Sequence, residues 1–348
     1  MHAPRPGSRV GGRAWRTLRL AGIVAALLGA AVALAAAAAW WWLGRALPLA
    51  SERVELSVEP GTAPRAVAEA WVAAGVRTDP RLLYEWFRWS GQARRIRAGS
   101  YEVEAGINPR ALLDKMVRGD ETLEQVRFIE GWTLRQVRAA LVEAPHLRPL
   151  TRAMSDAELM VALGVPGVPA EGRFFPDTYS YSRGVSDLTV LRRAHAAMQR
   201  RLESAWAERA PDLPLRSADE ALILASIVEK ETGREDERGR IAGVFVNRLR
   251  IGMPLQTDPT VIYGLGASFD GNLRRRDLEA DGPFNTYVRR GLPPTPIALP
   301  GLASLRAVVR PEPTRALYFV ARGDGTSAFS DNLADHNRAV NRYQRNSP

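Results

Sequence analysis

The sequence predicts an α+β protein with a single transmembrane helix near the amino terminus, a small α+β module and a larger mixed α+β domain. Three observations carry this prediction: an uncharged apolar run over residues 20–43, several segments with helical spacing, and short strand-like segments bounded by Gly and Pro. The 348 residues suffice for about two domains. A hydrophobic content of 46% with nine Trp excludes a disordered chain.

The composition excludes several classes of function. The chain has no Cys, which excludes disulfides, thiolate nucleophiles and iron–sulfur clusters. Its four His are not at metal-ligand spacing, so we expect no metal and no cofactor. Residues 1–50 hold six Arg and no acid, and the rest of the chain balances 42 basic against 38 acidic residues. The net charge of +10 is therefore a property of the amino terminus, and we expect no nucleic-acid partner.

The run over residues 20–43 predicts a transmembrane helix. A helix of 24 residues at ~1.5 Å per residue is about 36 Å long, enough for a ~30 Å hydrocarbon core. Five Arg precede the run and only Arg45 follows closely, so residues 1–19 should form a cytoplasmic tail, with everything after the run extracytoplasmic. We expect a single-pass protein of the plasma (inner) membrane. The alternative is a cleaved signal peptide, but the run exceeds the ~7–15 residues of such a segment.

Residues 52–120 predict the small module. Its expected elements are, in order, a strand over 54–58, helices over 66–75 and after Pro80, a strand over 97–106 and a helix over 108–119 with Asn108 as N-cap. This order resembles a LysM-like glycan-binding module with an added strand and helix. A small support domain would explain the same order.

Residues 121–348 predict the larger domain. Its expected elements are a strand over 123–132, helices from Thr133, over 156–165 and over 187–207, a helical hairpin over 218–232 and 235–249, a helix over 301–309, a strand pair around Gly323–Gly325 and a helix from Asn332. Residues 171–181 are expected to form an aromatic-rich loop and 252–299 a long irregular segment. Such a long irregular segment inside a compact domain is usually functional.

Glu231 is the candidate catalytic group. At about 100° per residue it falls in the middle of the apolar face of the helix over 218–232, whereas Glu229 falls on the opposite side; Leu222 departs from this pattern. Partial burial and the negative end of the helix dipole both favour its protonated form, which suits a general acid. The alternative is an ordinary polar helix end, since the sequence KETGREDERGR is a run of charges.

Two polar triplets lie in the irregular segment. One is Gln256, Thr257 and Asp258, and the other is Asn285, Thr286 and Tyr287. Amide, hydroxyl and aromatic groups on loops are the groups that bind sugar hydroxyls and acetamido groups. Turn formation explains the same residues equally well.

A series of motifs over residues 52–345 resembles the endolytic murein transglycosylase (YceG-like) family. The motifs, in order, are EGWTL at 130–134, EGRFFPDTY at 171–179, ASIVEKET at 225–232, VFVNRLRIGMPLQTDPTVIYG at 244–264, FNTY at 284–287, GLPPTPIALPG at 291–301 and NLADHN at 332–337. The chain departs from the family's usual pattern at Phe284, where a Tyr is common, and at Thr295, where a Gly is common.

The resemblance implies a membrane-anchored enzyme that cuts peptidoglycan strands internally, at the bond between N-acetylmuramic acid and N-acetylglucosamine, and leaves 1,6-anhydro ends. It implies termination of nascent strands and peptidoglycan synthases as partners. Matched residue by residue, it makes Glu231 catalytic. The substrate-binding residues it suggests are Arg248, Gln256, Thr257, Asp258, Asn285, Thr286 and Tyr287.

Three other functions stay open at this point. A hydrolytic muramidase needs a second carboxylate, for which Asp177 and Asp258 are candidates. A non-catalytic wall-binding scaffold should have lost Glu231, which is present. An aminodeoxychorismate lyase would need pyridoxal phosphate on a Lys, and only Lys115 and Lys230 exist.

Overall fold

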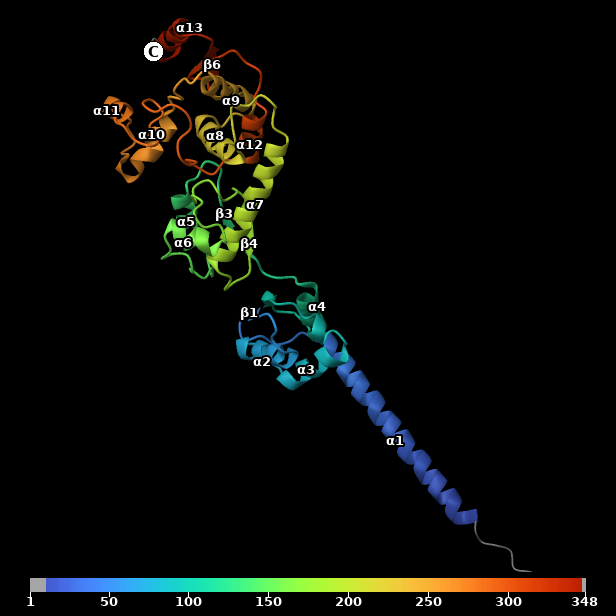
Figure 1. Ribbon diagram of the computed structural model, residues 1–348. Helices are drawn as coiled ribbons and strands as arrows, with labels where there is room; N and C mark the ends of the chain where they lie inside the picture. Colours follow the sequence, from blue (N-terminus) through green and yellow to red (C-terminus); the bar gives the residue numbers. More distant parts are fainter. Residues whose placement is uncertain (1–10, 346–348) are drawn as a thin grey trace, which may run out of the picture. The chain divides into compact units, whose positions relative to one another are not determined.

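The computed structural model describes residues 11–345, and the chain divides into two compact units, residues 1–123 and 124–348. Both units mix helices with a few short strands (Figure 1). In the described residues the strands form three separate two-stranded antiparallel sheets. The predicted mixed α+β class is confirmed.

Helix α1 (Gly11–Gly44) carries the predicted apolar run. Its segment Gly22–Gly44 has a mean hydropathy of 2.3 and is long and apolar enough to cross a membrane. A signal sequence near the amino terminus can also be this long and apolar. The carboxyl-terminal end of α1 packs onto the first unit, where the guanidinium of Arg110 stacks 3.9 Å from the ring centroid of Trp40. Residues 1–10 of the predicted tail lie outside the described residues.

The first unit has the order β1-α2-α3-β2-α4. The bounds are β1 Arg53–Val58, α2 Pro64–Ala74, α3 Pro80–Trp89, β2 Gly99–Glu104 and α4 Pro109–Arg118, with a 3₁₀ turn at Ala93–Arg95. Strands β1 and β2 pair along their whole length. Trp71 and Phe87 are fully buried between the helices and the sheet. Asn108 caps α4 by accepting a hydrogen bond from Ala111 N at 2.9 Å, as predicted.

The second unit begins with β3 (Glu124–Arg127) and continues through a longer series of elements. They are α5 Leu134–Glu143, α6 Asp156–Ala162, β4 Thr178–Tyr181, α7 Asp187–Ala207, α8 Ala218–Glu231, α9 Glu235–Arg250, α10 Asp258–Leu265, a 3₁₀ turn Gly266–Ser268, α11 Arg275–Glu279, α12 Leu302–Val309, β5 Tyr318–Ala321, β6 Ser327–Ser330, α13 Leu333–Val340 and a π-helical turn Asn341–Arg345.

The strand expected over 123–132 is shorter, because β3 ends at Arg127. Two other expectations for this unit are wrong. The segment 171–181 is not all loop, because its end is strand β4, which pairs with β3. The segment 252–299 is not wholly irregular, because it contains α10 and α11. Helix α10 was not predicted because Thr257-Asp258-Pro259, its N-cap and first two residues, has the composition of a β-turn. Pro is in fact favourable at an early position of a helix.

Helix α7 connects the two cores of the second unit, which lie at either end of it (Figure 1). Its first half, with Val190 and Leu191, packs in the core built by α5, α6, β3 and β4. Its second half, with Met198 and Leu202, packs in the core built by α8, α9 and α12. Helix α8 contacts α7, α9, α10 and α12, so it is surrounded. This explains why Leu222, off the predicted apolar face, is fully buried.

Candidate active site

Glu231 is the last residue of α8, at the carboxyl-terminal end of this central helix. Its carboxylate accepts a hydrogen bond from Thr257 Oγ1. Burial raises the pKa of Glu231, and the negative charge of Asp258 raises it further. The Thr257 hydrogen bond and the positive charge of Arg248 act in the opposite direction. With burial the largest cause, the side chain holds its proton to a higher pH than an exposed Glu and suits proton donation.

Glu229 has a different and structural environment. Its Oε2 accepts hydrogen bonds from Gly301 N at 2.9 Å and from Ser304 Oγ at 2.7 Å. These groups form the amino terminus of α12, where a carboxylate satisfies free N–H groups and is favoured by the helix dipole. Glu229 and Glu231 thus point to different parts of the fold, as the helical spacing predicted.

The two predicted polar triplets lie side by side at Glu231. Gln256 N donates to Thr286 O at 3.0 Å, and Thr257 N donates to Thr286 Oγ1 at 3.1 Å. Thr260 Oγ1 lies 2.9 Å from Thr286 Oγ1, which ties the first turn of α10 to the same loop. Gln256 has a φ of 49°, an unusual value for a residue other than Gly, so the loop bends sharply just before Thr257. This bend presents Thr257 Oγ1 to Glu231.

Four of the predicted substrate-binding residues are buried and bonded to the protein itself. They are Arg248, Thr257, Asn285 and Thr286. Asn285 Nδ2 donates to three backbone carbonyls, those of residues 277, 278 and 280, at 2.7 to 3.1 Å. Arg248 donates through Nε to Leu317 O at 2.7 Å and through Nη1 to Leu255 O at 2.6 Å. In the structure these side chains hold the loops in place around Glu231.

The remaining predicted residues present polar groups to the surface beside Glu231. Gln256 and Asp258 are exposed and Tyr287 is half-buried. Tyr287 Oη donates to Asp258 Oδ1 at 2.6 Å. Burial raises the pKa of Tyr287, and its hydrogen bond to Asp258 and that residue's charge raise it further. The carboxylate of Asp258 and the phenol of Tyr287 therefore lie together near Glu231, and the exposed Gln256 precedes them in the same loop. The substrate contacts of these residues stay predictions.

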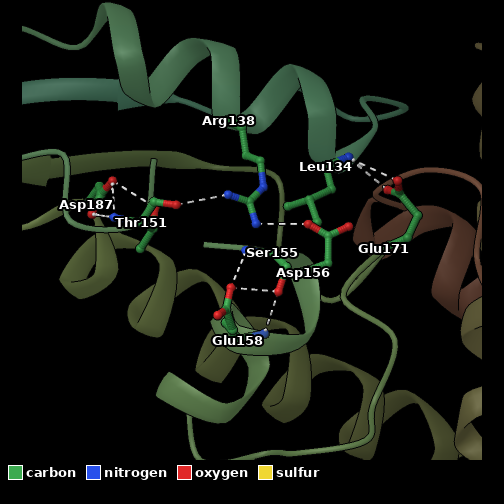
Figure 2. A network of polar contacts seen from close by, with 8 residues as sticks. All are labelled: Leu134, Arg138, Thr151, Ser155, Asp156, Glu158, Glu171 and Asp187. Carbon is green, nitrogen blue, oxygen red and sulfur yellow. Dashed lines mark hydrogen bonds and ion pairs between the residues drawn. The ribbon is translucent and has the colours of Figure 1, made fainter. Parts of the chain in front are cut away.

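The sequence analysis missed Glu171, a second buried carboxyl group. It accepts hydrogen bonds from Leu134 N at 2.9 Å, Gly172 N at 3.2 Å and Tyr263 Oη at 3.2 Å. Figure 2 shows it facing the first turn of α5. Burial raises the pKa of Glu171 to about 7, although these hydrogen bonds oppose the rise. The available signal was the motif EGRFFPDTY, in which a Glu stands among apolar residues.

The sequence and the fold are similar to those of known proteins. Residues 56–342 match the YceG-like family. The chain belongs to the YceG-like family. A Bacillus subtilis relative named endolytic murein transglycosylase is 30% identical over 307 residues, which covers 83% of this chain and 84% of that protein. A Streptococcus pneumoniae relative of the same name is 28% identical and covers 74% of this chain; the match spans about half of that longer protein, 53%.

A crystal structure of a YceG-like protein from Listeria monocytogenes has a similar fold. The TM-score is 0.54 at 28% sequence identity, over 82% of this chain and 98% of that one. The family relation covers both units of the present chain, because the matched residues begin within β1.

The two candidates for a second carboxylate in this YceG-like chain differ in position. Asp258 lies close enough to raise the pKa of Glu231 by its charge. Asp177 instead bonds its neighbour Thr178 N at 2.8 Å and lies 3.9 Å from the guanidinium of Arg201. Of the two, only Asp258 is part of the Glu231 site in the described residues.

Proposed function

We propose that this chain is a membrane-anchored endolytic murein transglycosylase. It cleaves the bond between N-acetylmuramic acid and N-acetylglucosamine within glycan strands and leaves 1,6-anhydromuramic ends. The proposal rests on Glu231, a carboxyl group with a raised pKa. It lies beside two loops that are rich in amide, hydroxyl and phenol groups. The names of the relatives support the same reaction.

One carboxyl group performs both proton transfers of this reaction. Glu231 first protonates the glycosidic oxygen of the leaving sugar, which its raised pKa favours. The muramic C6 hydroxyl then attacks the anomeric carbon of the same sugar, and the Glu231 carboxylate accepts the hydroxyl proton. No water enters the products, so the second carboxylate of an ordinary glycosidase is not required.

The surrounding residues orient this carboxyl group. The Thr257 hydroxyl donates to Glu231 and fixes its rotamer, and Thr257 is itself held by Thr286. Gln256, Asp258 and Tyr287 are placed to bind hydroxyl and acetamido groups of the strand. Arg248 and Asn285 act by holding these loops.

Mass spectrometry of fragments released from purified peptidoglycan tests the reaction. The transglycosylase yields ends that are one water lighter than hydrolytic ends. Reducing ends would instead favour a muramidase, in which the neighbouring Asp258 is the second carboxylate. Release of no fragments by the wild-type protein would favour a non-catalytic wall-binding scaffold.

We further propose the placement of the chain at the cell surface. Helix α1 anchors the protein in the plasma membrane with its amino terminus in the cytoplasm, because the Arg residues precede the apolar segment. The rest of the chain is extracytoplasmic, where it meets nascent strands, ends their elongation and works beside peptidoglycan synthases.

The first unit is proposed as a LysM-like glycan-binding module. Its order β1-α2-α3-β2, with two antiparallel strands enclosing two helices, supports this role. Helix α3 also exposes Trp89, which is 78% exposed, and Leu82. An exposed indole offers the flat apolar face on which sugar rings stack.

A further inference from the structure

A cleft of about 730 Å³ lies beside the Glu231 site, between α10 and the first turn of α5. Its volume is in the range of small-molecule sites. Apolar walls come from Ile262 and Phe269, and the inner surface includes Glu171, Tyr263 and Ile297. The proposed proton transfers and the sugar contacts use none of these residues.

The cleft starts next to the catalytic position. Lys230 lines it and directly precedes Glu231, and Pro259 lines it two residues after Thr257, the hydrogen-bond donor to Glu231. From Pro259 the cleft continues along α10 to Gly266. At ~1.5 Å of rise per residue this distance is about 10 Å. An extended peptide spans the same distance with about three residues.

The charges around the cleft favour an anion. Arg138 is already paired with Asp156 at 2.9 Å, as Figure 2 shows. Arg135 is exposed and has no ion-pair partner among residues 11–345. Within the described part of the chain, Lys230 donates a hydrogen bond to the carbonyl of Gly131, at 3.3 Å, and forms no ion pair. Arg135 and Lys230 therefore have no carboxylate partner among the described residues. The carboxyl group of Glu171 does not pair with them, and its oxygens accept hydrogen bonds from Leu134 N and Tyr263 Oη.

The negative charges of a murein strand lie on its stem peptides and not on its glycan backbone. The glycan backbone is neutral, because its amino groups are acetylated and its lactyl carboxyls are amide-linked to peptides. The negative charges are the free carboxylates of the short stem peptides, a few residues away from the muramic ring. That spacing is comparable to the length of about 10 Å over which the cleft follows α10 from Pro259 to Gly266.

We propose that this cleft binds the stem peptide of the muramic residue at the cleavage site, with Arg135 and Lys230 binding its free carboxylates and the apolar walls contacting its side chains. This inference rests on the proposed function. It makes the enzyme selective for strands that still carry anionic stems, and Arg135 and Lys230 are specificity residues for the reaction.

The test compares two strands with the full-length protein in detergent. One carries stems with free carboxylates, and the other carries the same stems with those carboxylates converted to primary amides. Losing one charge-assisted hydrogen bond corresponds to about a 10-fold change. Amidation removes the charged partners of both Arg135 and Lys230, so we expect the wild type to cleave the amidated strand at least about 10-fold less efficiently in kcat/KM. Arg135→Gln should raise KM about 10-fold for the free-carboxylate strand and leave the amidated strand unaffected.

Arg200→Gln is the matched control, because Arg200 is also an exposed Arg of the second unit and does not line the cleft. It should behave as the wild type on both strands. Equal cleavage of the two strands by the wild type would overturn the proposal. An equal loss on both strands in Arg135→Gln would also overturn it, since that pattern indicates a structural effect.

Calorimetry with the isolated stem tetrapeptide separates this proposal from the reaction itself. We expect the peptide to bind full-length Glu231→Gln protein and to bind the Arg135→Gln/Glu231→Gln protein about 10-fold more weakly. If no strand is cleaved but the peptide binds in this way, the subsite stands and the transglycosylase function fails. Absence of peptide binding rejects the subsite whether or not strands are cleaved.

Discussion

Replacing Glu231 by Gln should abolish most cleavage while leaving the fold intact. Gln has the same shape, and its amide oxygen still accepts the hydrogen bond from Thr257, but it exchanges no proton at working pH. Loss of general acid–base catalysis typically lowers the rate by ~10²–10⁴-fold. Because Glu231 serves both proton transfers, we expect a loss at the upper end of this range, about 10⁴-fold in kcat with little change in KM.

The pKa of Glu231 also predicts the effect on stability. Its folded pKa is raised above the ordinary value of 4.5, so the folded protein binds this proton more tightly than the unfolded chain. The resulting stabilisation is full below about pH 4.5 and is lost as pH rises through the folded pKa. Glu231→Gln has no such proton to lose, so this residue does not lower its stability as pH rises. Its melting temperature should therefore equal or exceed that of the wild type at neutral pH, and thermal scans from pH 4 to 8 measure this difference.

Glu229→Gln is the matched control for the assay. It lies two residues away on the same helix, and its side chain contacts the amino terminus of α12. Both of those hydrogen bonds end on one oxygen of Glu229, so the amide oxygen of Gln still accepts them. Only the interaction of the charge with the helix dipole is then lost, about 0.3–1 kcal/mol. Cleavage of peptidoglycan, followed by chromatography of released fragments, should stay near normal.

A Glu231→Gln enzyme with full activity would refute the assignment of the catalytic group. So would equal loss in Glu231→Gln and Glu229→Gln, because that result indicates damage to α8 and not loss of a proton donor. A fall in the melting temperature of Glu231→Gln at neutral pH would contradict the argument that its burial opposes ionisation.

Four further predictions concern the loops, Glu171, the membrane topology and the first unit. Asn285→Ala removes the amide that donates to the carbonyls of residues 277, 278 and 280 and accepts from Tyr287 N, and should lower the free energy of unfolding by about 3 kcal/mol in thermal unfolding. Gln256→Ala, which removes an exposed side chain, should lower activity with a nearly unchanged melting temperature. The Glu171 pKa of about 7 corresponds to about 3 kcal/mol of stability lost by the wild type between pH 4.5 and 7; Glu171→Gln should lack this loss in pH-dependent denaturation. A phosphatase reporter at the carboxyl terminus should be active only outside the cytoplasm, and activity inside would contradict the topology. Residues 124–348 alone should retain some cleavage and bind sacculi more weakly, and unchanged binding would make the first unit a spacer.

Most helices could be predicted from sequence because local signals mark their ends. The helix at Asp187–Ala207 has its predicted bounds, and Asn108 and Thr133 cap the helices that follow them. Strand β4 could not be predicted in this way. It has only four residues and exists because β3, about 50 residues earlier, pairs with it. Pairing over such a separation leaves no local signal.

The sequence predicted which residues lie together near Glu231, but not which of them are buried and which are exposed. Polar residues in an irregular segment pointed to both triplets, and the structure places them together. Sequence pattern does not distinguish a buried amide that bonds to the backbone, such as Asn285, from an exposed one, such as Gln256. Arg248 is similar: the family resemblance suggested it as a substrate-binding residue, but its guanidinium donates to protein carbonyls. These differences arise from tertiary packing.

Helix α10 explains why the site depends on a segment that looked irregular. Thr257, the residue before the helix, binds Glu231, and Tyr263 on the same helix binds Glu171. Gly264 lets Phe284 approach closely, because a Cβ there would lie 3.1 Å from the Cβ of Phe284, just before the second polar triplet. One short helix thus fixes the positions of Glu231, of Glu171 and of the loop beside them. A shift of α10 would change the hydrogen bonds of Glu231 and of Glu171 at the same time. The proton donor and the neighbouring cleft therefore depend on the position of the same helix.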